Sequence, residues 1–166
     1  MLVGEITDDE KKKADEEIRE QQKQIDYDTK DYTIERLVQK FEKNDFFIPD
    51  YQRALMWGNK NKNLFLESVL LGLPISLMFF ADCKDGKQEI IYGAQRIQAL
   101  VEFAKGNLQI QGLKKLKHVN GFKFDDLSEM QRRKFLNRTL RIVVLGENTP
   151  VSLRQELFYR INTAYA

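Results

Sequence analysis

The segment from Ile90 to Leu100 contains residues that could bind an anion. An apolar strand end is followed by Gly93, then by Gln95 and Arg96 at the start of an amphipathic helix. Gly93 lets the backbone turn sharply because it has no side chain. The helix start offers free backbone N–H groups where the dipole is positive, and Arg96 adds a permanent planar cation. Together they form a candidate cradle for an anion, most naturally a phosphate. The alternative is an ordinary strand–helix turn with a surface arginine.

A second candidate cluster lies in the loop after the apolar stretch 46–48. Tyr51, Gln52 and Arg53 are followed closely by Trp57. The aromatic side chains offer flat apolar faces, Gln52 offers an amide that donates and accepts, and Arg53 offers a bidentate fork. This set suits a nucleic-acid base or a sugar-phosphate. The alternative for the two aromatic residues is a place in the core or in a lid.

A third group, residues 160–163, lies near the end of the last expected helix and contains Asn162. The amide of Asn162 is either a hydrogen-bonding group of the helix C-terminus or a contact to a ligand. The sequence leaves both interpretations open.

The composition argues against several kinds of site. His118 is the only histidine, so a His-based metal cluster or a Ser-His-Asp triad is hard to build, and no metal site is expected. Cys83 is the only cysteine, which leaves no disulfide and no Cys-x-x-Cys pair. No apolar run approaches the length of a membrane span, and the N-terminus does not resemble a signal peptide. We therefore expect a cytoplasmic protein.

The net charge of +2 hides an asymmetry along the chain. Residues 1–31 hold eleven acids and six bases, a net charge of −5, so the remainder carries +7. We predict a charged N-terminal arm over residues 1–31, which is either solvated or docked on a partner. Residues 32–166 are expected to form one domain, as part of a longer protein. Its basic character is compatible with nucleic acid or phosphate ligands.

Hydrophobic periodicity predicts an α+β fold, with a small mixed sheet flanked by helices. The expected strands are 46–48, 75–80, 89–92 and 139–145, and the expected helices are 34–41, 64–71, 97–104, 128–137 and 152–161. Ser128 and Ser152 are the predicted N-caps of the last two helices, since each has a glutamine three residues later. Residues 108–124 are predicted to form short strands and loops.

Four short motifs occur in an order that resembles a known family. They are Ile48-Pro49-Asp50-Tyr51-Gln52-Arg53 with Trp57, Gly72-Leu73-Pro74-Ile75, Gly93-Ala94-Gln95-Arg96, and Phe158-Tyr159-Arg160-Ile161-Asn162-Thr163. Their succession resembles the N-terminal domain of GmrSD-type modification-dependent restriction enzymes, a bacterial family with a ParB/sulfiredoxin-like fold. The resemblance covers roughly residues 32–163.

The resemblance implies a part in bacterial phage defence. Members of the family bind and hydrolyse nucleotides at an Asp-Gly-Gln-Gln-Arg signature, which controls cleavage of modified foreign DNA by a separate nuclease domain. It implies an NTP ligand with Mg²⁺, DNA as a partner through the full system, a nuclease domain or subunit outside this chain, and no membrane. The residues that it assigns to nucleotide or phosphate binding are Arg53, Gly93, Gln95, Arg96 and Asn162, and those that it assigns to a base or DNA are Tyr51, Gln52 and Trp57.

This chain departs from the family signature at its acid. Tyr92 stands where the signature has aspartate, and Ala94 stands where glutamine is common. An aspartate there could orient water, hold a metal ion or act as a base, which a phenol with a pKa near 10 cannot do at neutral pH. Binding is expected to survive and hydrolysis to be weakened or absent. Asp50, Asp82 and Asp85 are candidate substitute acids, and no residue is assigned as catalytic.

Two other functions stay open from the sequence. One is a DNA-sensing module that uses the same basic pocket to read modified DNA. The other is a catalytically inactive scaffold in which Tyr92 is the disabling change. The chain contains no nuclease motif, so cleavage is expected from another domain or another chain.

Overall fold

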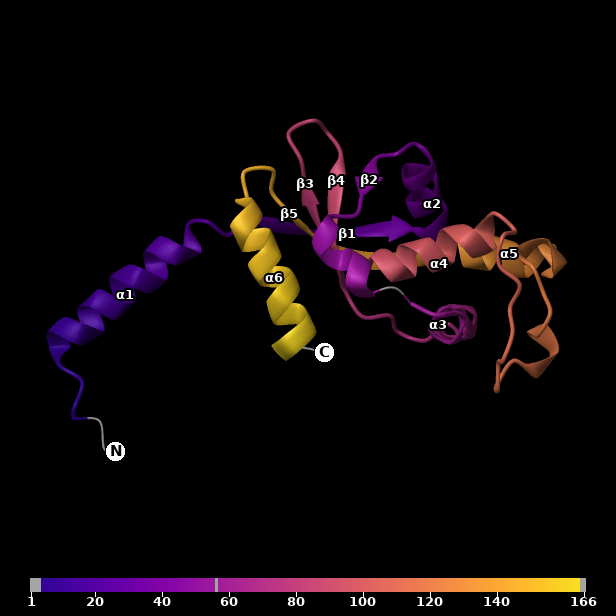
Figure 1. Ribbon diagram of the computed structural model, residues 1–166, viewed down its shortest axis with the longest axis horizontal. Helices are drawn as coiled ribbons and strands as arrows, with labels where there is room; N and C mark the ends of the chain where they lie inside the picture. Colours follow the sequence, from indigo (N-terminus) through magenta and orange to yellow (C-terminus); the bar gives the residue numbers. More distant parts are fainter. Residues whose placement is uncertain (1–3, 56, 165–166) are drawn as a thin grey trace.

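A five-stranded mixed sheet lies at the centre of the computed structural model, which describes residues 4–55 and 57–164 (Figure 1). Its strands are β1 (Tyr27–Thr33), β2 (Phe46–Phe47), β3 (Met78–Asp82), β4 (Gln88–Tyr92) and β5 (Thr139–Leu145). They are ordered β1-β5-β3-β4-β2. The pairs β1–β5 and β3–β4 are antiparallel, whereas β5–β3 and β4–β2 are parallel. The α+β prediction is confirmed.

The two faces of the sheet are covered unequally. The helices α2, α3, α4 and α5 enclose the main core with Phe80, Ile90 and Ile142 of the sheet; they comprise Ile34–Glu42, Asn59–Leu71, Ala94–Ala104 and Glu129–Asn137. On the other face, α6 (Val151–Ala164) packs Leu157 and Phe158 against a smaller cluster. The smaller cluster contains Ala81, Ile91 and Leu145. Neighbouring strand residues serve different clusters because side chains alternate between the faces of a sheet.

The N-terminal helix α1 (Asp8–Gln22) projects away from the body (Figure 1). It has no buried residue and begins with a capping box formed by Thr7 and Glu10. Residues 27–31, however, pair with β5, so the sheet begins inside the segment that the sequence assigned to the arm. The strand escaped the hydrophobic analysis because β1 is a polar edge strand, exposed along most of its length.

Of the two predicted helix N-caps, Ser128 and Ser152, the structure confirms one. The hydroxyl of Ser128 accepts a hydrogen bond from the N–H of Gln131 and caps α5, as predicted. The prediction for Ser152 is wrong, because α6 already begins at Val151. The carbonyl of Pro150 instead accepts the first helical N–H groups, those of Leu153 and Arg154. No helix among the described residues is long and apolar enough to cross a membrane.

The segment 108–124 contains no strand, which corrects the prediction of short strands there. It holds the 3₁₀ helix η2 (Lys117–Val119) and ends where a second, η3 (Phe124–Asp126), begins. Side-chain amides satisfy part of its backbone: Asn63 accepts from the N–H of Gln111, and Asn120 bonds both backbone groups of Leu113. This kind of long-range satisfaction leaves no periodic signal in the sequence.

Candidate functional site

The turn from β4 into α4 has the geometry that the sequence predicts. Gly93 caps α4 in the left-handed region, with φ of 114°. A Cβ at this position would lie 2.5 Å from Cγ of Met78, so both the backbone angle and the space require glycine. The carbonyl of Gly93 accepts the N–H of Ile97 at 3.1 Å. The N–H groups of the first turn of α4 therefore gather at the end of β4.

Arg96 lies in this first turn and is half-buried. Its Nη1 donates to the carbonyl of Ser76 at 3.0 Å, and its Cζ lies 5.4 Å from the ring centroid of Tyr92. Burial lowers the pKa of Arg96 from its usual value, but a guanidinium remains charged at neutral pH. Within the described residues no carboxylate pairs with Arg96. Among these residues the charge of Arg96 is therefore not neutralised by an acid.

Gln95 and Trp57 bring the second predicted cluster against α4. The backbone N–H of Trp57 donates to Oε1 of Gln95 at 3.3 Å. The indole ring of Trp57 packs edge-on to Phe65 of α3, with centroids 5.8 Å apart. Trp57 therefore packs against the main core, which is the alternative interpretation that the sequence left open for it. Its backbone also contacts Gln95 of the candidate phosphate site.

The 3₁₀ helix η1 (Asp50–Leu55) is fixed along β4, directly before Gly93. The amide of Gln52 is buried, and its Nε2 donates to the carbonyls of Ile90 and, at 2.6 Å, Ile91. The hydroxyl of Tyr51 donates to Oε1 of Glu89 at 2.8 Å. Because these polar groups make contacts inside the protein, their assignment to a base or DNA stays a prediction.

The remaining predicted site residues are Asn162 and Arg53. Nδ2 of Asn162 donates to the carbonyl of Phe158, one turn earlier in α6, at 2.8 Å. The ring of Phe158 lies 4.9 Å from that of Tyr51, so this part of α6 contacts η1. A ligand contact by Asn162 stays a prediction. The side chain of Arg53 lies outside the described residues, so its assignment to phosphate binding stays a prediction.

A buried ion pair beside this site was missed by the sequence analysis. Glu89 and Arg154 are 4% and 6% exposed, and Nη1 of Arg154 donates to Oε2 of Glu89 at 2.9 Å. Arg154 also donates to the carbonyls of Thr149 and Asp82, each at 3.1 Å. One signal was available: Glu89 lies two residues before Ile91 in a strand, a position on the same inward face. A charge at such a position requires a buried partner.

Tyr51, Glu89 and Arg154 form one network that links α6 to η1. Burial raises the pKa of Tyr51 above its usual range, and the hydrogen bond and charge of Glu89 raise it further. Burial lowers the pKa of Arg154, but the hydrogen bonds and charges of Glu89 and Cys83 together outweigh this and leave it raised. Tyr51 therefore donates as a neutral phenol to an ionised pair. The network holds the motif around Gln52 against β4.

The candidate substitute acids of the hairpin lie at the other end of β4. Asp82 ends β3 and accepts from Nε2 of Gln88 at 3.0 Å, while Asp85 accepts from the N–H of Lys87 in the turn. Gly93 follows the opposite end of β4, roughly 17 Å away for a strand of this length. Among the residues that the structure describes, no group of three or more His, Cys, Asp or Glu side chains could hold a metal ion.

Comparison with known proteins identifies a family. The model of the family described as GmrSD restriction endonuclease, N-terminal domain, matches residues 34–165. This match includes all four motifs quoted above and confirms the resemblance seen in the sequence. No curated protein and no solved structure gives a significant match to the chain.

Proposed function

Because the chain belongs to the GmrSD restriction endonuclease N-terminal domain family, we propose that it is a nucleotide-binding regulatory domain. The family places it among components of restriction and phage-defence systems, which include a nuclease part and act on DNA. The proposal is that binding of a nucleotide or phosphate at the start of α4 regulates a nuclease that lies outside this chain. A cytoplasmic location accompanies it, since the DNA to be cleaved lies there.

One observation carries the proposal: Arg96 lies beside the first turn of α4 with no carboxylate partner among the described residues. A helix start presents N–H groups to a phosphate, and a guanidinium can add two parallel hydrogen bonds to its oxygens. The carbonyl of Ser76 accepts a hydrogen bond from Nη1 of Arg96, so the other N–H groups of this guanidinium remain for the ligand. Gln95 lies in the same turn of α4.

We propose further that hydrolysis is weak or absent. Tyr92 supplies no carboxylate at the signature position, and a phenol does not serve as a base at neutral pH. Glu89, an acid of the same strand, already accepts from Tyr51 and Arg154. The described residues of this strand therefore do not fit as ligands for Mg²⁺. On this proposal the domain binds a nucleotide without efficient turnover.

Isothermal titration calorimetry with each of ATP, GTP, CTP and UTP, with and without Mg²⁺, tests the proposal. We expect at least one of them to bind the wild-type chain and Arg96→Ala to weaken that binding. Arg36→Ala is the matched control, since Arg36 is an exposed arginine of α2. Absence of binding for all four nucleotides would refute the proposal, as would equal binding by Arg96→Ala and the control.

A further inference from the structure

The positive charge of the body is concentrated in one stretch of the chain. Residues 105–138 contain nine lysines and arginines and three acids, which gives +6. All of residues 32–166 together carry only +7. The stretch begins at the C-terminal end of α4 and includes α5. Its first residue, Lys105, follows the C-terminal end of α4, about 16 Å along the helix from Gly93.

The loop in this stretch is held rigidly by a buried acid. Glu67 of α3 is 7% exposed, and its Oε2 accepts the backbone N–H groups of Lys115 and Leu116, each at 3.1 Å. Because Glu67 binds the backbone rather than an ammonium group, it does not pair with the lysines of the loop. The side chains of Lys114, Lys115 and Lys117 are all exposed.

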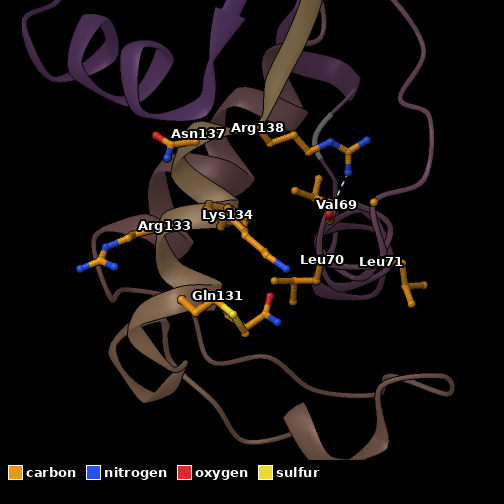
Figure 2. A pocket seen from close by; sticks show the side chains of 11 residues that line it. Val69, Leu70, Leu71, Gln131, Arg133, Lys134, Asn137 and Arg138 are labelled. Carbon is orange, nitrogen blue, oxygen red and sulfur yellow. Dashed lines mark hydrogen bonds between the residues drawn. The ribbon is translucent and has the colours of Figure 1, made fainter.

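A second group of cations comes from α5. A cleft of about 640 Å³ lies between α5 and the C-terminal end of α3. In Figure 2, Lys134 reaches from α5 toward Leu70 of α3, whereas Arg133 points away from α3. Arg138 instead donates a hydrogen bond to α3, from its Nη1 to the carbonyl of Val69 at 2.7 Å.

The loop and α5 lie against neighbouring parts of the same helix. The loop contacts α3 at Asn63 and Glu67, and the cleft begins at Val69 and extends to Gly72. From Asn63 to Gly72 the helix rises by about 14 Å. We call the exposed lysines along this edge the basic face; they are Lys114, Lys115, Lys117 and Lys134.

The charges of the basic face are not neutralised by ion pairs inside the protein. Within the described part of the chain none of its four lysines has a carboxylate partner, whereas Arg133, which points away from α3, pairs with Glu129. The acidic arm differs, because Lys13 and Arg19 pair with acids of their own helix. Uncompensated charges of one sign produce a local potential that attracts a polyanion.

We propose that the basic face binds the phosphate backbone of duplex DNA, without regard to sequence. Duplex DNA presents a negative charge about every 1.7 Å along its axis, so several phosphates fit along an edge of this length. A second copy of the chain is a poorer complement, since the charges of its acidic helix α1 are partly paired within that helix. The site is separate from the start of α4 and does not depend on nucleotide binding.

Fluorescence anisotropy with a short labelled DNA duplex of arbitrary sequence, titrated at several salt concentrations, tests this surface on the full chain. The decisive pair of triple variants is Lys114→Ala/Lys115→Ala/Lys117→Ala and Lys11→Ala/Lys12→Ala/Lys13→Ala. Each removes three exposed lysines, so the change in net charge is the same. We expect the loop variant to bind about tenfold more weakly, with a log–log salt slope lower by up to about 3, because each lost phosphate contact contributes about 0.9. The arm variant should bind like wild type.

Two further variants separate this proposal from folding effects and from the nucleotide site. Lys134→Glu changes the same face from a different element and should also weaken binding, whereas Arg96→Ala should not. Equal DNA affinity of the two triple variants would overturn the proposal, as would an affinity that does not depend on salt. Sedimentation analysis provides the third check: self-association that disappears in the loop variant would assign the face to a second copy of the chain instead.

Discussion

The guanidinium of Arg96 lies over the ring of Tyr92, with Cζ 5.4 Å from the ring centroid. The ring stands where the family signature has a carboxylate. A carboxylate at this distance would neutralise the cation, whereas the face of an aromatic ring attracts it and leaves its charge in place. On the proposed function, Tyr92 therefore supplies no catalytic carboxylate and leaves the charge of Arg96 available to a phosphate.

If the ring orients Arg96, its aromatic face matters and its hydroxyl does not. Tyr92→Phe should keep the nucleotide affinity of wild type. Tyr92→Leu should weaken it by about two- to fivefold, since a cation–π contact contributes about 0.5 to 1 kcal/mol at a partly exposed site. Calorimetry with the nucleotide that binds best measures both. A loss in Tyr92→Phe as large as that in Tyr92→Leu would show that the hydroxyl carries the effect.

Restoring the signature acid tests the proposal that Tyr92 weakens hydrolysis. Tyr92→Asp should raise NTP turnover, because a positioned base contributes about 10²- to 10⁴-fold. Phosphate release under saturating nucleotide is the measurement, and Tyr92→Asn, which matches aspartate in shape and lacks its charge, is the control. A variant with aspartate that shows no gain over the asparagine control would remove Tyr92 as the cause.

Gly93 should tolerate substitution less well than the other glycines with positive φ. Gly93→Ala places a Cβ 2.5 Å from Met78, in addition to the unfavourable backbone angle. Gly106→Ala is the control, since its φ is +79° and an added Cβ meets no atom within 4 Å. We expect a loss of about 1 to 3 kcal/mol for the strained backbone in both variants and a larger loss at position 93. Urea unfolding measures the difference, and equal losses would show that Met78 moves aside freely.

The parts of the fold that could be predicted are those with a local cause. The spacing of Ile34, Leu37 and Val38 fixes one face of α2, and all three are buried. Ser128 caps α5 through a residue three positions later. Gly93 marks the turn into α4 because a positive φ is costly for any other residue. In each case the signal and its structural consequence lie within about two helical turns.

The parts that could not be predicted depend on residues far apart in the sequence. The pairing of β1 with β5 joins Tyr27 to Leu145, and the polar sequence of β1 carries no periodic signal. Similarly, Glu89 and Arg154 each resemble a surface residue until the fold brings them together. The candidate site is divided in the same way, since Gly93 and Arg96 follow from a local motif, whereas the contacts of Gln52 with β4 do not.

The buried Glu89–Arg154 pair should be more sensitive to loss of one partner than of both. Arg154→Met leaves a buried carboxylate without its cation, which costs about 3 to 5 kcal/mol, whereas a hydrophobic replacement of both residues is often neutral. The double variant Glu89→Leu/Arg154→Met should therefore be more stable than Arg154→Met. Arg141→Ala, which breaks the exposed pair with Asp31, should cost far less than Arg154→Met, because solvent screens that pair. Urea unfolding compares the three, and a double variant no more stable than Arg154→Met would contradict a coupled pair.

The phenol of Tyr51 should make the protein less stable at alkaline pH. Burial first, and then the hydrogen bond and charge of Glu89, raise the pKa of Tyr51 in the folded state. Above about pH 10 the unfolded chain therefore binds fewer protons than the folded protein, and stability falls as the pH rises; below about pH 10 the contribution is fully present.

Tyr51→Phe removes this titration and also the bond to Glu89. We expect it to be less stable than wild type at neutral pH, with a difference that narrows above about pH 10. Tyr159→Phe controls for removal of an exposed phenol. Denaturant unfolding at increasing pH provides the measurement, and a constant difference between wild type and Tyr51→Phe would refute the raised pKa.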